Sequence, residues 1–524
     1  MISKGDTPMK QWIAVLLTLT LLLTPMIATA QTESNTPPVE NDLATTPVIM
    51  GDVSRNGNIG ADDALRVLKS CVGKISFDPH DRYNDVPGAG IAADVDGNGY
   101  INATDALQIL QNVVGKIDRF PADEGLYGQS LTLKTPFADR YNTEPYASFL
   151  DKLEQQYGMT LTIVPQGDSV QSDLQSAQET ADVLELNYAF ARNMGREGYL
   201  VNLQGLPNQL SREIPTRATG FGQYLYGVGF ELREGGMQGI FYNKTLLNQV
   251  APDYDLNALY TEGKWDFTTL RELTALATKD TDQDGKIDLY GITANTQLVE
   301  MALVAGGGLS RLEYNHEAGV EQPAVYVKEN ISAQLETAPY LTLQEMMKTD
   351  KSWLYKADIN QCVENFTQGN ALMFAGYVSY SDLILGNTDF EVGFIPMVKE
   401  KDSFHKTTTV TGAVFSVPKG KEDKASAAIA LATQLQLLKP YLTEQVKQQY
   451  LQKGLDETSA QHVANLQNRA TLDYSVGVVS LAQLASAPVP AVVTGETPMQ
   501  RIVKQFQSEL DEYYMPFYDF VIFD

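Results

Sequence analysis

Past residue 130, the apolar residues of the chain follow two alternating periods. Short runs with the composition of strands are separated by stretches in which apolar residues recur at helical spacing. The expected strands are 131–134, 160–164 and 183–186, and the expected helices are 146–157, 270–278 and 425–438. This alternation predicts an α/β architecture. The last stretch, 496–524, is expected to be helical, then aromatic, and packed.

The first 30 residues have a different pattern. Two lysines precede an apolar run from Trp12 to Leu23, Pro25 ends the run, and Ala28 and Ala30 are small residues at the positions that a signal peptidase reads. The run is too short to span a bilayer comfortably. We therefore expect a cleaved secretory signal over 1–30 and no membrane insertion after cleavage, with an uncleaved anchor as the alternative.

The remaining chain is too long for one ordinary core, so several domains are expected. Residues 31–48 are rich in Thr, Pro, Asn and Glu and are typical of a flexible linker. A small module is expected at 49–118, a second short linker at 119–129, and a large two-lobed domain at 130–524.

Composition narrows the possible partners. The chain has 39 Lys and Arg against 65 Asp and Glu, a formal charge of −26, which argues against nucleic acid and anionic membranes and favours divalent cations. The two cysteines, Cys71 and Cys362, are too few for a disulfide framework and are expected to be unpaired and buried. Cys71 corresponds to Val113 in the repeat described next, and is expected in the core.

An internal repeat runs from Asp52 to Lys74 and again from Asp94 to Lys116, at an offset of 42 residues. At least ten identities share this offset, which chance does not explain. Ten of the residues of the first copy that recur in the second are Asp52, Gly57, Ile59, Asp63, Ala64, Leu65, Leu68, Val72, Gly73 and Lys74.

Each copy opens with the spacing of a calcium-binding loop. Oxygen-bearing residues stand at alternating positions, a glycine allows the sharp turn at position 6, position 7 offers its backbone carbonyl, and an aspartate closes the loop at position 12. The ligands expected are Asp52, Ser54, Asn56, Asn58 and Asp63 in the first loop, and Asp94, Asp96, Asn98, Tyr100 and Asp105 in the second. The first loop is expected to bind calcium more weakly, because Ser54 stands where the second has Asp96. A turn without metal is the alternative.

Neither loop is preceded by a sequence that favours the entering helix of an EF-hand. A duplicated calcium loop with only its exiting helix resembles a dockerin, over about residues 49–118. The resemblance implies a small all-α module that binds cohesin domains of a scaffold protein. In that family, loop positions 10 and 11 help to select the cohesin, and here they are Ala61, Asp62, Ala103 and Thr104. These residues depart from the common Ser-Thr pair, which leaves the partner open.

A third acidic run lies in the large domain. Its possible calcium ligands are Asp280, Asp282, Asp284, Lys286 and Asp288. Position 12 is Gly291, so the closing carboxylate is missing and would have to come from elsewhere. A solvated acidic turn is the alternative to a structural calcium site.

Several separated segments of the large domain resemble the extracellular solute-binding proteins that serve ABC importers, especially the oligosaccharide-binding branch. They include 181–184, 198–203, 239–244, 265–267 and 393–396. The resemblance implies a periplasmic-binding-protein-like domain of type II, with two α/β lobes that close by a hinge on a ligand, and an importer permease as a further partner. The expected ligand contacts are Glu185, Asn187, Tyr188, Tyr226, Tyr242, Trp353 and Tyr377.

These features predict a secreted, non-catalytic binding protein for a solute, most simply an oligosaccharide, held near the cell surface through a scaffold. One alternative is a scaffold-borne glycoside hydrolase, which would need two carboxylates flanking a bond. No catalytic residue is assigned, because the chain has no Gly-x-Ser-x-Gly elbow or phosphate loop, and its 4 His are scattered. Another alternative is a binding protein whose calcium module is purely structural.

Overall fold

The structure is a computed structural model that describes residues 43–471 with gaps. The gaps are 44, 78–85, 212, 222–223, 231, 234–235, 300, 302–311, 315–322, 326–337, 400–407, 410 and 467–469. The expected signal segment and the expected packing of 496–524 lie outside the described residues. Within the described part of the chain, no helix is both long and apolar enough to cross a membrane.

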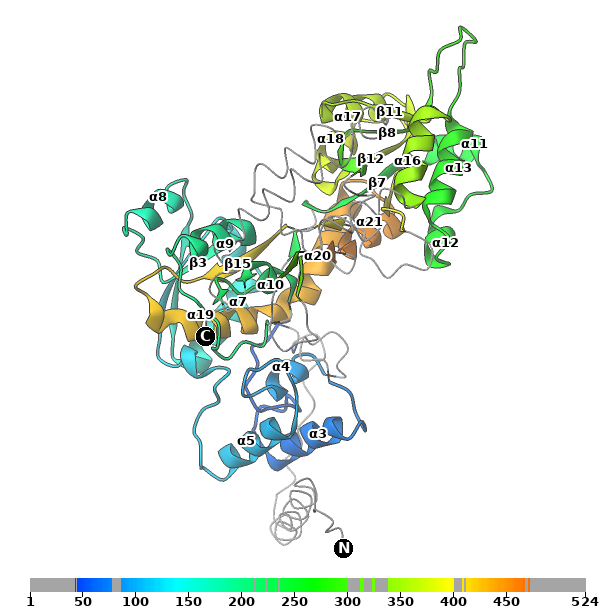
Figure 1. The fold of residues 1–524 in the computed structure, drawn as a ribbon. Coiled ribbons are helices and arrows are strands. Elements are labelled where there is room, and N and C mark those ends of the chain that lie inside the picture. Colours follow the sequence, from blue (N-terminus) through cyan, green and yellow to red (C-terminus); the bar gives the residue numbers. More distant parts are fainter. Residues whose placement is uncertain are drawn as a thin grey trace, which may run out of the picture. The chain divides into compact units, whose positions relative to one another are not determined.

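The repeated loops form a small helical module. Each loop leads into an 11-residue helix, α3 (Ala61–Cys71) or α5 (Ala103–Val113), and these two helices pack against each other (Figure 1). The third residue of each helix is an aspartate whose carboxylate accepts a hydrogen bond from the backbone N–H just before the helix. The last ligand of each loop therefore also caps the helix that follows it.

The two loops are entered differently, which the sequence did not predict. Residues 45–51, before Asp52, contain no helix, but the five-residue helix α4 (Ala89–Ala93) lies directly before Asp94. Gly88 opens α4 with φ of 79°, a left-handed conformation that glycine adopts without strain. Every residue of α4 is buried, because its small side chains allow close packing.

The first lobe is built on a five-stranded sheet in the order β2-β1-β3-β15-β6. Its strands are β1 (Ser130–Thr135), β2 (Thr160–Pro165), β3 (Val183–Asn187), β6 (Leu232–Arg233) and β15 (Thr411–Ser416). β1 is parallel to both β2 and β3, whereas β15 is antiparallel to β3. The helices of this lobe include α7 (Tyr146–Tyr157), α9 (Tyr188–Arg196) and α19 (Ala425–Leu435) (Figure 1).

The second lobe has its own five-stranded sheet, in the order β11-β8-β12-β7-β13. Its strands are β7 (Gln238–Asn243), β8 (Tyr290–Ala294), β11 (Trp353–Tyr355), β12 (Ala371–Tyr377) and β13 (Val392–Pro396). Helices α13 (Phe267–Ala277) and α16 (Ala338–Lys348) pack together beside it (Figure 1). A helical module followed in the sequence by two separate α/β sheets confirms the predicted fold class. The three strands and three helices expected at 131–186 and at 146–157, 270–278 and 425–438 are all present.

The other described elements are shorter or connect the sheets. The helices are α6 (Ala138–Tyr141), α8 (Val170–Gln175), α10 (Ile214–Thr219), α11 (Lys244–Val250), α12 (Leu256–Thr261), α17 (Ile359–Thr367), α18 (Ser381–Ile384), α20 (Lys439–Gln452) and α21 (Glu457–Ala464). The strands are β4 (Gly220–Phe221), β5 (Tyr224–Leu225), β9 (Leu312–Tyr314), β10 (Pro323–Val325), β14 (Thr408–Thr409) and β16 (Ala470–Thr471). Four 3-10 turns are Glu124–Leu126, Val378–Tyr380, Glu422–Lys424 and Gln436–Leu438.

The helical module and the first lobe share one apolar core. Val48 is fully buried, and its N–H donates to Gln434 Oε1 at 2.9 Å while its carbonyl accepts from Gln434 Nε2 at 3.0 Å. Phe120 and Leu126 are also buried in this core. The end of the first expected linker (31–48) and most of the second (119–129) are therefore packed. Their large apolar side chains are buried in the core that the module shares with the first lobe.

The two cysteines differ. Both are free thiols, and Cys362 is buried as expected, but Cys71 is exposed. Cys71 and its counterpart Val113 are the last residues of α3 and α5, where the helices extend beyond the buried positions Val67 and Ile109. The expectation that Cys71 belongs to the core was therefore wrong.

Candidate functional site

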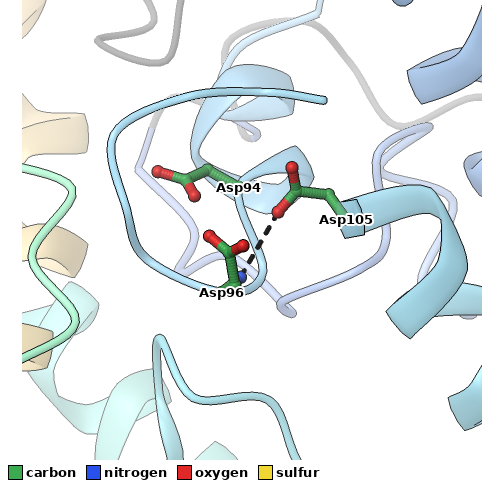
Figure 2. A group of neighbouring side chains, drawn as sticks. All are labelled: Asp94, Asp96 and Asp105. Atoms are coloured by element: carbon green, nitrogen blue, oxygen red, sulfur yellow. Dashed lines mark hydrogen bonds between the residues drawn. The ribbon is translucent and has the colours of Figure 1, made fainter. Parts of the chain in front are cut away.

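The second loop, residues 94–105, brings three carboxylates together. Asp94, Asp96 and Asp105 each place one oxygen within 4.8 Å of the others, and Figure 2 shows them converging inside the loop. Burial, with repulsion between the carboxylates, raises the pKa of Asp94 to about 8 and that of Asp105 to about 6. Such a cluster of acidic groups is stabilised by a hard cation between them.

Backbone hydrogen bonds fix the orientation of these carboxylates. Asp94 accepts from the N–H of Asn98 at 3.1 Å and of Gly99 at 2.9 Å. Asp105 accepts from the N–H of Asp96 at 3.3 Å and of Asn102 at 2.8 Å. Gly99 has φ of 81°, so the sharp turn needs the glycine found at position 6.

The first loop, residues 52–63, has the same scaffold. Asp52 accepts from the N–H of Asn56 at 3.0 Å and of Gly57 at 2.8 Å. Asp63 accepts from the N–H of Ser54 at 2.7 Å and of Gly60 at 2.8 Å, and burial raises the pKa of Asp63. Position 3 contributes a hydroxyl here, and the Ser54 Oγ donates to Asp52 at 3.3 Å.

Both loops fit calcium in donor type and arrangement. Oxygen-bearing side chains occupy positions 1, 3, 5 and 12, and these are the ligands that Ca²⁺ prefers. At position 7, the Tyr100 side chain is 58% exposed, so its backbone carbonyl is the group available to the ion. The structure thus brings the ten predicted ligand residues into two similar loops.

The third acidic loop lies between α13 and β8. Asp280, Asp282 and Asp288 each place a carboxylate oxygen within 4.8 Å of the others. Asp280 accepts from the N–H of Asp284 at 3.2 Å and of Gly285 at 2.8 Å. These bonds join position 1 to positions 5 and 6, as in the two loops of the module.

Asp288 closes this third loop from position 9. Its carboxylate accepts from the N–H and the hydroxyl of Thr281, both at 2.7 Å, and these bonds hold its pKa below the ordinary value. The closing carboxylate was expected at position 12 or from elsewhere in the chain, whereas Asp288, at position 9, reaches back to the loop entrance. Lys286 donates to Asp284 at 3.3 Å.

The outer faces of α3 and α5 carry matching apolar side chains. Leu65 is 50% exposed and its counterpart Leu107 is 47% exposed, and the residues just after the two helices, Val72 and Val114, are 70% and 62% exposed. The residues expected to select a partner, Ala61, Asp62, Ala103 and Thr104, are all exposed at the starts of the same helices. The module therefore presents the same surface twice, once from each repeat.

In the first lobe, the expected ligand contacts lie at the carboxyl end of β3. Glu185 is 2% exposed and accepts hydrogen bonds from the hydroxyls of Thr135 at 2.6 Å and Tyr141 at 2.9 Å, and from Arg140 at 2.9 Å. Asn187 is exposed and caps α9 by accepting from the N–H of Ala189 at 2.9 Å. Of these two, Asn187 has its side chain at the surface.

The five aromatic candidates also differ in burial. Tyr188, Tyr226, Tyr242 and Trp353 are 0%, 7%, 4% and 4% exposed. They belong to the apolar cores of the lobes, and the Trp353 indole donates to the carbonyl of Ala294 at 3.1 Å. Tyr377 ends β12 half-buried, with its ring centroid 6.2 Å from that of Tyr380.

A calcium-loop module joined to two α/β sheets defines a binding protein of the two-lobed class with a dockerin-like appendage. The family model for bacterial extracellular solute-binding proteins matches residues 140–435, more than half of the 524 residues, and the chain belongs to this family. The model for the dockerin type I domain matches residues 50–114. No curated protein matches the chain.

Solved structures with a similar fold include UspC of M. tuberculosis, with a TM-score of 0.50 and 15% identity over 72% of this chain and 98% of that one. An ABC substrate-binding protein of Listeria monocytogenes in complex with cycloalternan has a TM-score of 0.43 and 12% identity over 74% and 98% of the two chains. The maltose-binding protein MalE of the same organism, in complex with maltose, has a TM-score of 0.47 and 13% identity over 74% and 98%.

Proposed function

We propose that this chain is a secreted, non-catalytic binding protein for an oligosaccharide, attached through its calcium-loaded dockerin to a cohesin-bearing scaffold. The observation that carries the proposal is the presence, in one chain, of a two-lobed solute-binding domain and a module with an exposed, repeated apolar face. A surface-held binding protein of this kind would hand its ligand to an importer permease. The proposed ligand contacts that are not buried in a core are the exposed Asn187 and the half-buried ring of Tyr377.

Ligand binding is tested by thermal shift of the full chain against a panel of oligosaccharides, with hydrolysis products assayed in the same wells. A ligand that binds only the native state raises the melting temperature by mass action. A shift without cleavage supports the binding protein. Cleavage would instead identify a scaffold-borne glycoside hydrolase.

Scaffold docking rests on the outer faces of α3 and α5. Exposed apolar patches of this kind mark protein-binding surfaces, and the two copies offer them at equivalent positions. The double substitution Leu65→Asp with Leu107→Asp should abolish binding to a type I cohesin. The matched control is Leu341→Asp with Leu383→Asp, because these leucines are each 48% exposed but lie in the second lobe. The control should bind like the wild type.

Calcium chelation separates docking from a purely structural role for the module. Loss of the cohesin complex, while the sugar-binding thermal shift persists, supports calcium-dependent docking. A wild-type chain that binds no cohesin, and only loses stability on chelation, would favour the purely structural module.

We also propose three calcium ions, two in the dockerin and one in the loop that begins at Asp280. The carboxylate clusters of the second and third loops support this number, as do the backbone hydrogen bonds that the first loop shares with them. Metal analysis of the full chain after dialysis should give three ions, and Asp288→Asn should lower the count by one.

A further inference from the structure

The segment that joins the calcium module to the first lobe is packed on both of them. On the side of the module, the Ala122 N–H donates to the carbonyl of Val95 at 3.2 Å. On the side of the lobe, Gly125 lies in the 3-10 turn Glu124–Leu126, and a Cβ on it would come within 2.7 Å of the backbone nitrogen of Ala427 in α19. The turn and α19 therefore pack backbone against backbone, unlike a flexible linker, which makes no fixed contacts.

The segment that enters the first loop is bound to two helices of the same lobe. The Val48 N–H donates to Gln434 Oε1 at 2.9 Å, and the Val48 carbonyl accepts from Gln434 Nε2 at 3.0 Å. The same carbonyl accepts from Gln156 Nε2, in α7, at 2.7 Å. Gln434 belongs to α19 and is 1% exposed, so its bonds are shielded from water and are costly to break.

A third contact joins the second loop to the lobe. Gln209 is 2% exposed and donates to the carbonyls of Ile91 at 3.1 Å and Asp94 at 2.5 Å. The Asn208 N–H donates to the carbonyl of Gly97. All of these bonds end on backbone carbonyls of the module, so they fix its backbone and leave the side-chain oxygens of the loop for calcium.

Contacts at separate places resist rotation in a way that a single connection does not. Domains of one chain are expected to move relative to each other unless their interface is large and apolar. Here the module and the first lobe share one apolar core, and the buried bonds of Gln209 and Gln434 reach the module at different points. A tilt of the module would expose apolar surface and leave buried carbonyls without partners.

We propose that the calcium module and the first lobe form one rigid body, held together by Gln209 at the second loop and by Gln434 before the first loop. The module is then not a tethered domain. A scaffold bound to the outer faces of α3 and α5 would hold the first lobe in a fixed orientation. Only this consequence for docking rests on the proposed function, since the rigidity itself needs neither a sugar nor a cohesin.

The test measures distances by pulsed electron paramagnetic resonance in the full, calcium-loaded chain. One spin label is attached to the native Cys71, which is exposed, and the other to Gln155→Cys at an exposed position of α7, whereas Cys362 is buried. The reference pair lies within the first lobe and consists of Gln155→Cys with Gln171→Cys, at an exposed position of α8, in a Cys71→Ser background. One rigid body predicts a single distance for each pair, with distributions of equal width.

Gln209→Ala with Gln434→Ala removes both sets of bonds and changes no proposed calcium ligand. It should broaden the distribution between Cys71 and position 155, while the reference pair keeps its width and so shows that the lobe is still folded. Gln297→Ala is the matched control, because Gln297 is also buried, at 8% exposed, but lies in the second lobe. This control should keep the narrow distribution.

A broad or multiple distribution between Cys71 and position 155 in the wild type overturns the inference. So does an equally narrow distribution in the double variant, because the two glutamines would then not hold the module. Both results are obtained without sugar or cohesin, so neither bears on the proposed function. Failure of the chain to bind a cohesin would remove the proposed docking and leave the measured rigidity unchanged.

Discussion

The two calcium loops share their ligand pattern but differ at position 4. In the first loop this residue is Arg55, which adopts φ of 58° and is 6% exposed. Its guanidinium donates to the backbone carbonyls of Thr46 at 2.8 Å, Pro47 at 3.2 Å and Leu43 at 3.3 Å. The first loop therefore organises the segment that leads into it.

The second loop has Gly97 at the same position, with φ of 71°. A Cβ there would come within 2.8 Å of Pro207 Cβ in the first lobe. Beside it, Gln209 donates to the backbone carbonyls of Ile91 at 3.1 Å and Asp94 at 2.5 Å, and the Asn208 N–H donates to the Gly97 carbonyl. The residue at position 4 thus gives the two loops different contacts. Arg55 holds the segment before the first loop, whereas Gly97 allows the first lobe to pack against the second loop.

The largest expected effect follows from this contact between the second loop and the first lobe. Asp94→Asn should reduce calcium binding to the second loop and loosen residues 200–217 of the first lobe, because Gln209 is bonded to the backbone carbonyl of Asp94 itself. Loss of an ion present at a thousand times its Kd costs about 4 kcal/mol. Asp52→Asn should destabilise the module without reaching 200–217. Hydrogen–deuterium exchange with and without calcium measures both, and equal protection of 200–217 in the two variants would remove the asymmetry.

Exchanging the residues at position 4 should cost somewhat less. Gly97→Arg places a side chain against Pro207 in a left-handed conformation, which should lower the free energy of unfolding by roughly 2–4 kcal/mol. Arg55→Gly relieves the backbone but loses the bonds to three carbonyls, for a net loss of about 1–2 kcal/mol. Chemical denaturation in calcium checks the order. If Arg55→Gly were the more damaging change, the contact with Pro207 would matter less than the geometry indicates.

The sequence predicted both loops because their turns and backbone hydrogen bonds are fixed locally by position in the repeat, whereas the individual calcium ligands stay a prediction. Period and composition also predicted three strands of the first sheet, β1, β2 and β3, whereas the second lobe was expected only from the resemblance to solute-binding proteins. The sequence did not predict the contact between the second loop and the first lobe. Gln209 and Asp94 are 115 residues apart in the sequence, and no local pattern encodes such a contact. For the same reason Tyr188 and Trp353 seemed suited to a ligand, whereas they are buried in the cores of the lobes.

A smaller effect separates the affinities of the loops. Ser54→Asp gives the first loop the carboxylate that Asp96 provides in the second, and should tighten calcium binding there about tenfold, or about 1.4 kcal/mol. Asp96→Ser should weaken the second loop by a similar factor. Calorimetric calcium titration, made in the Asp288→Asn background to remove the third site, resolves the two steps. If the steps did not move in opposite directions, the charge at position 3 would not set the order of affinities.

The smallest expected effect concerns the other end of the contact between the module and the first lobe. Asp123 follows the second repeat, is 3% exposed, and accepts from the hydroxyl of Tyr157 at 3.0 Å. That hydroxyl accepts in turn from Gln434 Nε2 at 3.0 Å, and Gln434 also bonds Val48, just before the first loop. Both ends of the repeat thus meet on one buried polar network.

Burial raises the pKa of Asp123 to about 7, although the bond from Tyr157 opposes the shift. The folded state therefore holds this proton more tightly than the unfolded chain, so its contribution to stability is present at low pH and is lost as pH rises through about 7. Asp123→Asn keeps an oxygen for Tyr157 and cannot ionise. As the pH rises from 5 to 8, the melting temperature of the variant should rise relative to that of the wild type, by about 1–2 °C for each kcal/mol of difference in stability. Saturating calcium is needed, because the loop carboxylates titrate as well, and parallel pH profiles for the two proteins would show that Asp123 does not ionise in the folded state.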